Sequence, residues 1–594
     1  MMARAAAVYV STDGDDANEG TYEAPKKTIQ AVLNGWQYGQ VLVLKKGIYH
    51  LQEQKLDGET GALHLNGTGE IRGETGNPAD VVIDGDATTE CIRLAGRMLL
   101  HGITFQNGRK PSSSGAQAAN LSIQSATITV SNCVVRSAAE NGRNIPAVRL
   151  LEGSKIVDSR FVGIEGTCAG AALDLAGTNE VVRCVFESCS VPFQTADSPP
   201  CAVRVRRATR LVDCVFSNNA CISVHATCTN DTPAAVSTIA GCLFTGNTSE
   251  RAACRAEDYV VVAGCTFANN VSATSAGALH VFGATVTNCT FVGNSAEHFG
   301  GALLSRTTPA CPSRVIDCVF AGNAAYNGGA VSVGYTSGAT TSSGCSSGYV
   351  LMDRCLISNN VARATAPTGN YLGGGGIFFA AKAVGGLSGG EVRNCQIVDN
   401  SSSWEGGGVC VRNWHGTAGF TGSWPILMRN CLVARNTAAV EGGGLYIIHN
   451  GADGPYLVES CTVVDNKARN HASGHGLYHK LDGFSCRNTV FARNTMLTNN
   501  AKQYDHCCFD PNQNTAFNMS AASDSLAADA QLADPDAGDY RLASTRSPCC
   551  NTGFREAWMA DAVDLDGVAR IFSSAPDMGC YELSWPVGTM LLFR

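Results

Sequence analysis

Two glutamates stand at equivalent places in the sequence. Glu405 and Glu441 each come directly before three consecutive glycines. On neighbouring parallel strands their backbones would lie about 4.8 Å apart. Two carboxyl groups about 5 to 5.5 Å apart are the arrangement of a retaining glycosidase, in which one group is the acid and the other the nucleophile. The pair is equally suited to a divalent cation, and two solvated corner residues are the third interpretation.

Aromatic side chains surround this pair in the sequence. Large ring faces with polar edges suit sugar rings, so we expect carbohydrate contacts from Trp404, Trp414, His415, Trp424 and Tyr456. The alternative is that these rings pack their own loops against the rest of the protein. Cys311 and Cys345 flank the region and are candidates for a disulfide that joins two loops.

A six-residue motif must position these residues. It has the form Cys-x-Φ-x-x-Asn, where Φ is Phe, Ile or Val, and its ten copies begin at Cys214, Cys242, Cys265, Cys289, Cys318, Cys355, Cys395, Cys431, Cys461 and Thr489. The shortest step between copies, from Cys242 to Cys265, is 23 residues, and the longest, from Cys355 to Cys395, is 40. Degenerate copies precede them at Cys133 and Cys184. A fixed motif at this period indicates a repeat architecture.

The motif predicts an all-β fold. Cys and Φ are two residues apart, so in a strand they share one face, which must be the buried one. A glycine pair such as Gly300-Gly301 and then a third apolar run separate each motif from the next. Three short strands per repeat indicate a right-handed parallel β-helix, a solenoid in which each repeat forms one coil. The cysteines then form an internal thiol ladder, and the asparagines hydrogen-bond from coil to coil.

The longest steps between copies predict a binding region. They place insertions at one corner of consecutive coils, and in solenoids such insertions often form the binding face. The inserted residues are 335–347, 380–390, 412–423 and, in the next coil, 449–455.

Three parts of the chain resemble known families. The motif followed by Gly-Gly-Ala-Φ is similar to the repeats of polymorphic outer-membrane proteins. The opening, which includes Tyr9-Val10-Ser11-Thr12-Asp13-Gly14, resembles secreted pectate-lyase-like β-helix proteins. The ending, which includes Asp564-Leu565-Asp566-Gly567 and Met578-Gly579-Cys580-Tyr581-Glu582, resembles the closing segment of the same secreted bacterial group. The resemblance implies a secreted or cell-surface protein, and because adhesins, lyases and hydrolases share this coil it does not choose an activity. For a lyase it would make Lys382 or Arg412 the base.

The expected organisation has three parts. Residues 1–60 form an N-terminal capping unit, in which Pro25 to Trp36 is an amphipathic helix that closes the core. Residues 61–494 are the coils, and residues 495–594 are an irregular C-terminal cap and tail. Within the tail we expect disulfides among Cys507, Cys508, Cys549, Cys550 and Cys580. Asp564-x-Asp566-Gly567 matches half of a calcium loop, which leaves calcium as an alternative to the absence of any cofactor or metal.

Composition narrows the class of protein. The 594 residues carry 43 Lys and Arg against 51 Asp and Glu, a net charge of −8, with no basic stripe visible in the sequence. Nucleic acid is therefore not an expected partner. No apolar run approaches the roughly 18 to 20 residues of a membrane-spanning helix. The start of the chain shows no full signal peptide.

Two functions from different classes follow. The first is a secreted or cell-surface β-helix protein of adhesin or structural type, which presents loops to a polysaccharide, a surface glycan or a protein partner and can self-associate. The alternative is a polysaccharide lyase or glycoside hydrolase that acts in a groove beside the long-loop coils. The residues leave open whether the protein is an enzyme.

Overall fold

The structure is a computed structural model. It describes residues 7–54, 63–109, 118–124, 127–136, 145–192, 200–227, 236–334, 347–364, 373–382, 387–414, 424–449, 456–470, 474–479, 484–494, 504–511 and 522–583. The chain divides into two compact units. Unit 1 is Met1–Ala273 with Ala278–His280, and unit 2 is Thr274–Gly277 with Val281–Arg594.

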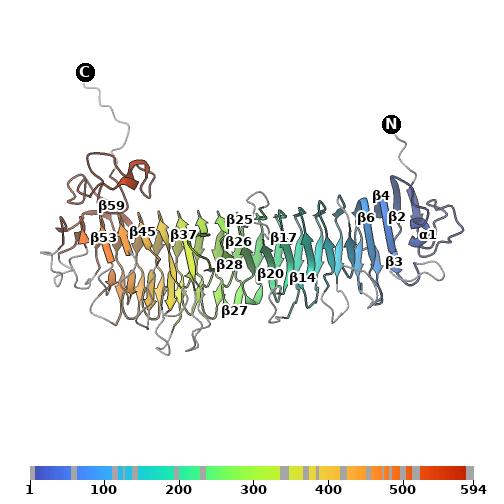
Figure 1. The fold of residues 1–594 in the computed structure, drawn as a ribbon, viewed down its shortest axis with the longest axis horizontal. Coiled ribbons are helices and arrows are strands. Elements are labelled where there is room, and N and C mark those ends of the chain that lie inside the picture. The colour runs from blue at the N-terminus through green and yellow to red at the C-terminus, as the bar shows by residue number, and fades with distance from the viewer. Residues whose placement is uncertain are drawn as a thin grey trace, which may run out of the picture. The chain divides into compact units, whose positions relative to one another are not determined.

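Both units are built from parallel strands that stack in chain order (Figure 1). From β8 onward a coil contributes two strands to one sheet, called sheet A, and one strand to a second, called sheet B; the earlier β4 and β6 each span both sheet A positions. Coils from β23 (Thr248–Arg251) to β51 (Lys467–Ala468) add a short strand to a third sheet, of eight strands among the described residues. Each strand pairs with its equivalent one coil further along the chain. The predicted parallel β-helix is therefore confirmed.

Unit 1 begins with β1 (Ala7–Val10), α1 (Ile29–Leu33) and β2 (Gln40–Leu44). The first sheet A strand of each later coil is β4 (Leu63–Gly73), β6 (Ile92–His101), β8 (Leu121–Ile123), β11 (Val148–Leu150), β14 (Ala169–Ala176), β17 (Cys201–Arg206), β20 (Ile222–Thr227) and β24 (Cys254–Glu257). The second is β9 (Thr129–Ser131), β12 (Lys155–Val157), β15 (Glu180–Val182), β18 (Arg210–Val212), β21 (Thr238–Ala240) and β25 (Val261–Ala263). Sheet B has β3 (Gly47–His50), β5 (Val81–Asp84), β7 (Thr104–Gln106), β10 (Val134–Arg136), β13 (Arg160–Val162), β16 (Val185–Glu187), β19 (Val215–Ser217), β22 (Leu243–Thr245) and β26 (Thr266–Ala268).

Unit 2 repeats this arrangement. The first sheet A strand of each coil is β32 (Leu303–Ser305), β36 (Val331–Val333), β40 (Ile377–Lys382), β44 (Val409–Trp414), β48 (Leu445–His449) and β52 (Leu477–His479). The second is β29 (Thr285–Thr287), β33 (Ser313–Ile316), β37 (Gly348–Asp353), β41 (Ser388–Arg393), β45 (Ile426–Arg429), β49 (Tyr456–Glu459), β53 (Phe484–Arg487) and β55 (Tyr504–Asp505). Sheet B has β30 (Thr290–Val292), β34 (Val319–Ala321), β38 (Leu356–Ser358), β42 (Gln396–Val398), β46 (Leu432–Ala434), β50 (Thr462–Val464), β54 (Val490–Ala492), β56 (Cys508–Phe509) and β57 (Leu526–Ala527).

The inward side chains are those that the motif predicts. Motif cysteines such as Cys214 and Cys355 are 0% and 2% exposed. The Φ side chains are fully buried, and phenylalanines of successive coils stack with ring centroids 4.7 Å apart for both Phe216–Phe244 and Phe291–Phe320. Parallel pairing in register places equivalent motif positions of successive coils side by side, so the same residue type stacks on itself along the core.

The asparagine ladder is also present. The Oδ1 atom of Asn360 accepts hydrogen bonds from the backbone N–H and the Nδ2 of Asn323, both at 2.9 Å. Its Nδ2 donates to Asn400 Oδ1 at 2.9 Å and to the Phe320 carbonyl at 3.0 Å. Each described ladder asparagine thus satisfies a backbone group that turns away from the sheets at the corner.

The corners depend on single left-handed residues. The predicted glycines adopt positive φ, for example 65° at Gly300 and 60° at Gly406. The residue before each motif cysteine does the same, and it is usually Asn, Asp or Gly, which tolerate this region best. Arg354 is an exception at φ 52°. Its guanidinium makes a bidentate pair with Asp317, the equivalent residue of the preceding coil, at 2.7 and 3.0 Å.

The expected N-terminal helix is present but short. Of the predicted segment from Pro25 to Trp36, only α1 is helical, with Thr28 Oγ1 accepting the Ala31 N–H at its start. Ile29, Val32 and Leu33 face the core. The expected boundary at residue 60 lies outside the described residues and stays a prediction. No helix in the described ranges is long and apolar enough to span a membrane.

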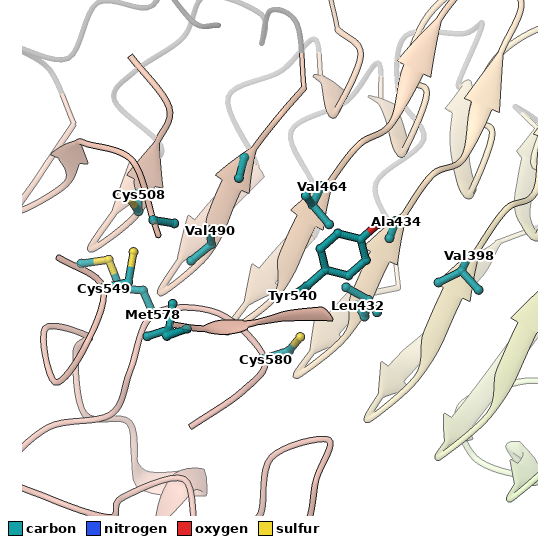
Figure 2. Packing of buried hydrophobic residues seen from close by; sticks show 13 residues of the cluster. Val398, Leu432, Ala434, Val464, Val490, Cys508, Tyr540, Cys549, Met578 and Cys580 are labelled. Atoms are coloured by element: carbon teal, nitrogen blue, oxygen red, sulfur yellow. The ribbon is translucent and has the colours of Figure 1, made fainter. Parts of the chain in front are cut away.

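The C-terminal segment covers the outward face of sheet B in unit 2 (Figure 2). It contains β58 (Leu532–Asp534), β59 (Asp539–Leu542) and the 3-10 helix η4 (Ala557–Asp561). Tyr540, Met578 and Cys580 pack there against Leu432, Val464 and Val490. The predicted disulfides are wrong: Cys507, Cys508, Cys549, Cys550 and Cys580 are free thiols. Most of them are buried, so they act as small apolar side chains.

Candidate functional site

Glu405 and Glu441 lie on neighbouring coils of unit 2, as the glycine triplets predict. The Gly406 N–H donates to the Glu441 carbonyl at 3.0 Å, and the Gly374 N–H donates to the Glu405 carbonyl at the same distance. Each glutamate precedes a left-handed glycine, with φ 60° at Gly406 and 63° at Gly442. The corner therefore presents the two side chains from the same position of adjacent coils.

The Glu405 side chain is buried rather than solvated. The residue is 6% exposed, and its Oε2 lies 2.5 Å from Nη1 of Arg412. Burial raises the pKa of the Glu405 carboxyl, and the negative charge of Glu441 adds to that rise. The Arg412 charge and hydrogen bonds from Tyr446 and Trp404 oppose it. Three donors therefore converge on one carboxyl group.

Two stacked tyrosines continue the site. Tyr446 on β48 and Tyr478 on β52 are at equivalent positions of adjacent strands, and their rings stack with centroids 5.2 Å apart. The Arg412 guanidinium carbon lies 5.8 Å from the centre of the Tyr446 ring. Tyr446 is 2% exposed, whereas Tyr478 is partly exposed. Burial, and the charges of Glu441 and Glu405, raise the pKa of Tyr478, which hydrogen-bonds Glu441.

We call these six residues the Glu405 site: Trp404, Glu405, Arg412, Glu441, Tyr446 and Tyr478. Its inner part is a charge pair covered by an aromatic ring. Its outer part combines the partly exposed carboxylate of Glu441 with the partly exposed rings of Trp404 and Tyr478. Rings next to a hydrogen-bonding carboxylate suit a polyhydroxylated ligand such as a sugar.

The other candidate residues fall elsewhere. Tyr456 is 1% exposed and faces the core, so its predicted contact with a ligand is wrong; the period of β49 points it inward. Trp424 is partly buried and packs edge-to-face on Tyr349, with ring centroids 5.9 Å apart. The side chains of Trp414 and His415, and most of the predicted insertions, lie outside the described residues. So does Cys345, the predicted partner of Cys311.

The calcium alternative at the C-terminal end does not fit the geometry. Asp564 Oδ1 accepts the backbone N–H groups of Asp566 and Val568 at 2.9 and 2.8 Å, and its Oδ2 accepts that of Glu582 at 2.7 Å. Asp566 pairs with Arg541 at 2.6 Å. The oxygens that a calcium ion would need are therefore occupied by hydrogen bonds of the turn.

The sequence interpretation missed the two tyrosines. The signal was present, because Gly-Leu-Tyr occurs at both Gly444–Tyr446, where it continues the triplet after Glu441, and Gly476–Tyr478, at the equivalent place of the next coil. Alternation along β48 and β52 places both rings on the outward face, next to the corner. Comparing the residues after the corner glycines of successive coils, as well as those before them, would have found the pair.

Comparison with known proteins adds little to this site. No protein-family model and no curated protein matches the chain. Among solved structures it is similar to the catalytic domain of a GH87 alpha-1,3-glucanase in complex with tetrasaccharides, at 12% identity and TM-score 0.36, covering 56% of this chain and 63% of that one. It is also similar to a PL6 alginate lyase complex with trisaccharide, at 11% identity and TM-score 0.33, over 66% of this chain and 86% of that one. The pectate lyase Pel9A matches at 13% identity and TM-score 0.23, over 97% and 96%. Likenesses this distant carry no information about activity or substrate.

Proposed function

We propose that this protein binds a polysaccharide, and that the outer part of the Glu405 site is where the sugar is recognised. The observation that carries the proposal is the convergence of two partly exposed rings, Trp404 and Tyr478, on the carboxylates of adjacent coils. The rings supply stacking surface, and Glu441 accepts hydrogen bonds from sugar hydroxyls. A secreted or cell-surface location, predicted from the sequence, suits this role.

The inner part of the site supports the outer part. Arg412 neutralises Glu405 and holds it beside Tyr446, and Tyr446 in turn supports the ring of Tyr478. A platform held by packing loses little conformational entropy when a ligand binds. Glu405, Arg412 and Tyr446 are therefore assigned a positioning role.

The test is a binding titration of the full chain against neutral and acidic oligosaccharides by isothermal titration calorimetry. Tyr478→Ala and Trp404→Ala should each raise the dissociation constant by about tenfold or more, as expected for the loss of an aromatic anchor. Tyr478→Phe keeps the ring and should lose less. Tyr38→Ala, at a 77% exposed tyrosine of unit 1, is the matched control and should bind like the parent. If the Trp404 and Tyr478 variants both bind the oligosaccharide as tightly as the parent does, the proposed site is refuted.

A second candidate function is glycoside hydrolysis. Two observations favour it: the glutamates occupy equivalent corners of adjacent coils, and burial raises the pKa of Glu405, as a general acid requires. In this mechanism Glu405 donates the proton and Glu441 is the nucleophile. The 2.5 Å contact with Arg412 opposes it, since that charge favours the ionised form.

Product assays separate the two functions. Hydrolysis would release reducing ends from a bound polysaccharide, whereas a lyase would produce unsaturated, ultraviolet-absorbing ends. Glu405→Gln and Glu441→Gln should each abolish release while the parent's ligand still binds. A chain that binds a glycan but produces neither product from it is a binding protein.

A further inference from the structure

Unit 1 assembles a line of arginines that is not apparent in the sequence. Successive coils place Arg149, Asp174, Arg204, His225 and Arg255 at the same outward position of sheet A, on β11, β14, β17, β20 and β24. Strands β14, β17 and β20 are labelled in Figure 1. Neighbouring members are 21 to 30 positions apart along the chain, with no regular spacing. Only the register of the strands aligns them.

Two further charged residues flank this line. Arg206 lies two positions beyond Arg204 on β17, and Glu257 lies two beyond Arg255 on β24, so both also face outward. We call the seven residues the arginine column. It holds four guanidinium groups against two carboxylates, although the whole chain carries a net charge of −8. The column is therefore a local concentration of positive charge on an acidic protein.

The arginine column is incompletely paired. Arg206 Nη2 contacts both oxygens of Asp174 at 2.7 Å, and Arg149 reaches the same carboxylate only at 3.5 Å. Within the described part of the chain, Arg204 has no carboxylate within ion-pair distance. Arg255 pairs with Glu257, and His225 Nε2 lies 3.3 Å from the same carboxylate. Arg204 is therefore the guanidinium of the column that is left without an ion pair among the described residues.

Buried polar atoms of the column also lack partners. The Nε atom of Arg206 and the Nδ1 atom of His225 are shielded from solvent and make no hydrogen bond within the described residues, and the Nε atom of Arg149 has only its 3.5 Å contact with Asp174. The His225 side chain is 7% exposed. The hydroxyl of Ser122, one coil before Arg149 in the same line, is also buried without a hydrogen-bond partner among the described residues. Leaving a buried polar atom unsatisfied costs about 1 to 3 kcal/mol, so the column is not fully satisfied by its own residues. The side chains of Arg149 and Arg206 are still 30% and 26% exposed, and these exposed atoms are the ones that a ligand can contact.

We infer that the arginine column binds an anionic polysaccharide, one whose sugars carry carboxylate or sulfate groups. Guanidinium groups bind both anions through paired hydrogen bonds. Adjacent coils are about 4.8 Å apart, so an extended chain that runs along sheet A meets a new side chain at each coil. The inference concerns unit 1 and does not depend on the Glu405 site.

The column fits a polysaccharide better than a nucleic acid. Asp174 and Glu257 interrupt the cations, and carboxylates accept hydrogen bonds from sugar hydroxyls but repel a phosphate at every unit. Sequence-tolerant nucleic-acid grooves use aromatic rings on which bases stack. The outward positions of the column provide no Phe, Tyr or Trp.

The experiment compares polymers that differ only in charge. Isothermal titration calorimetry of the full chain at low salt would use polygalacturonate oligomers and their methyl esters, and dextran sulfate and unmodified dextran. We expect at least tenfold tighter binding of the charged member of a pair, weakening as salt screens the charges. Binding in the first pair identifies carboxylate as the ligand group, and binding in the second identifies sulfate.

Two arginines of one coil provide the variant and its control. Arg204→Gln should raise the dissociation constant by about tenfold or more, as expected for the loss of a charge-assisted hydrogen bond. It should leave the melting temperature unchanged, since Arg204 has no ion-pair partner to lose. Arg210 on β18 is 61% exposed, and Arg210→Gln should bind within twofold of the parent.

Three results would overturn the inference. They are no binding of any charged polymer by the parent at low salt, binding that Arg204→Gln leaves unchanged, and tighter binding of a single-stranded oligonucleotide with the same dependence on Arg204. The last would assign the column to nucleic acid. Loss of sugar binding in the Tyr478 variant alone would bear on the Glu405 site and not on this column.

Discussion

The asparagine ladder makes a quantitative prediction about Asn360→Ala. Asn360 is 0% exposed, and its side chain takes part in four hydrogen bonds, two accepted from Asn323 and one donated to each of Asn400 and Phe320. Its backbone N–H still reaches Asn400 Oδ1 after the substitution, at 3.0 Å. The alanine therefore removes the four side-chain bonds and leaves the Asn323 N–H and the Phe320 carbonyl unsatisfied in the core.

The expected loss is large for one residue. Each hydrogen bond contributes about 1 kcal/mol net, so the four together give about 4 kcal/mol of unfolding free energy. Asn360→Asp should cost at least as much, because a carboxylate oxygen replaces the donor and faces two acceptors. Ser358→Ala, at an outward position of β38, is the control and should stay within about 0.5 kcal/mol.

Urea unfolding followed by circular dichroism measures the global loss. Stacked coils do not always unfold in a single step, so amide hydrogen exchange of the Asn323 peptide provides a local measurement. Exchange there should accelerate in Asn360→Ala and stay slow in Ser358→Ala. If the two variants unfold at the same urea concentration and exchange alike, the ladder contributes no net stability and the reasoning fails.

Three further predictions concern the core. Phe291→Ala should lower the unfolding free energy by about 3 to 5 kcal/mol, because the ring is fully buried and stacks on Phe320. The outward Thr290→Ala should change it by less than about 0.5 kcal/mol, and equal losses of the two variants in urea unfolding would contradict the alternation of buried and outward residues. Burial lowers the pKa of His479 to about 4, so as pH falls the unfolded chain takes up the proton first, and the folded state loses about 3 kcal/mol of stability between about pH 6.5 and pH 4. His479→Phe should reduce this loss of stability at acid pH, and an unchanged loss would exclude His479 as its cause. The motif thiols from Cys214 to Cys461 should resist iodoacetamide in the native protein and react after unfolding, as mass spectrometry would report; rapid native labelling would contradict their burial.

Much of the candidate site could be predicted from the sequence, and its environment could not. The glycine triplets after Glu405 and Glu441 align the two residues, because glycine at a left-handed corner has few substitutes. Whether a corner side chain is solvated depends on the neighbouring coil. Glu405 is buried since Tyr446, 41 residues later, and Arg412 close over it. The structure keeps the predicted alignment of Glu405 and Glu441 on adjacent coils, but Glu405 is not the solvated corner residue that one interpretation expected.

The sequence by itself determined the coil. Cys-x-Φ-x-x-Asn has a fixed internal offset, and the two-residue period of a strand converts that offset directly into one buried face and one corner. The inward cysteines, the stacked phenylalanines and the asparagine ladder follow from local spacing alone. Only the tertiary structure decided what the outward faces carry. Steps between coils vary in length, so the pairing register, and not distance along the chain, brings Arg149, Arg204 and Arg255 into one line. Apolar packing on side chains from several coils holds the C-terminal segment over sheet B.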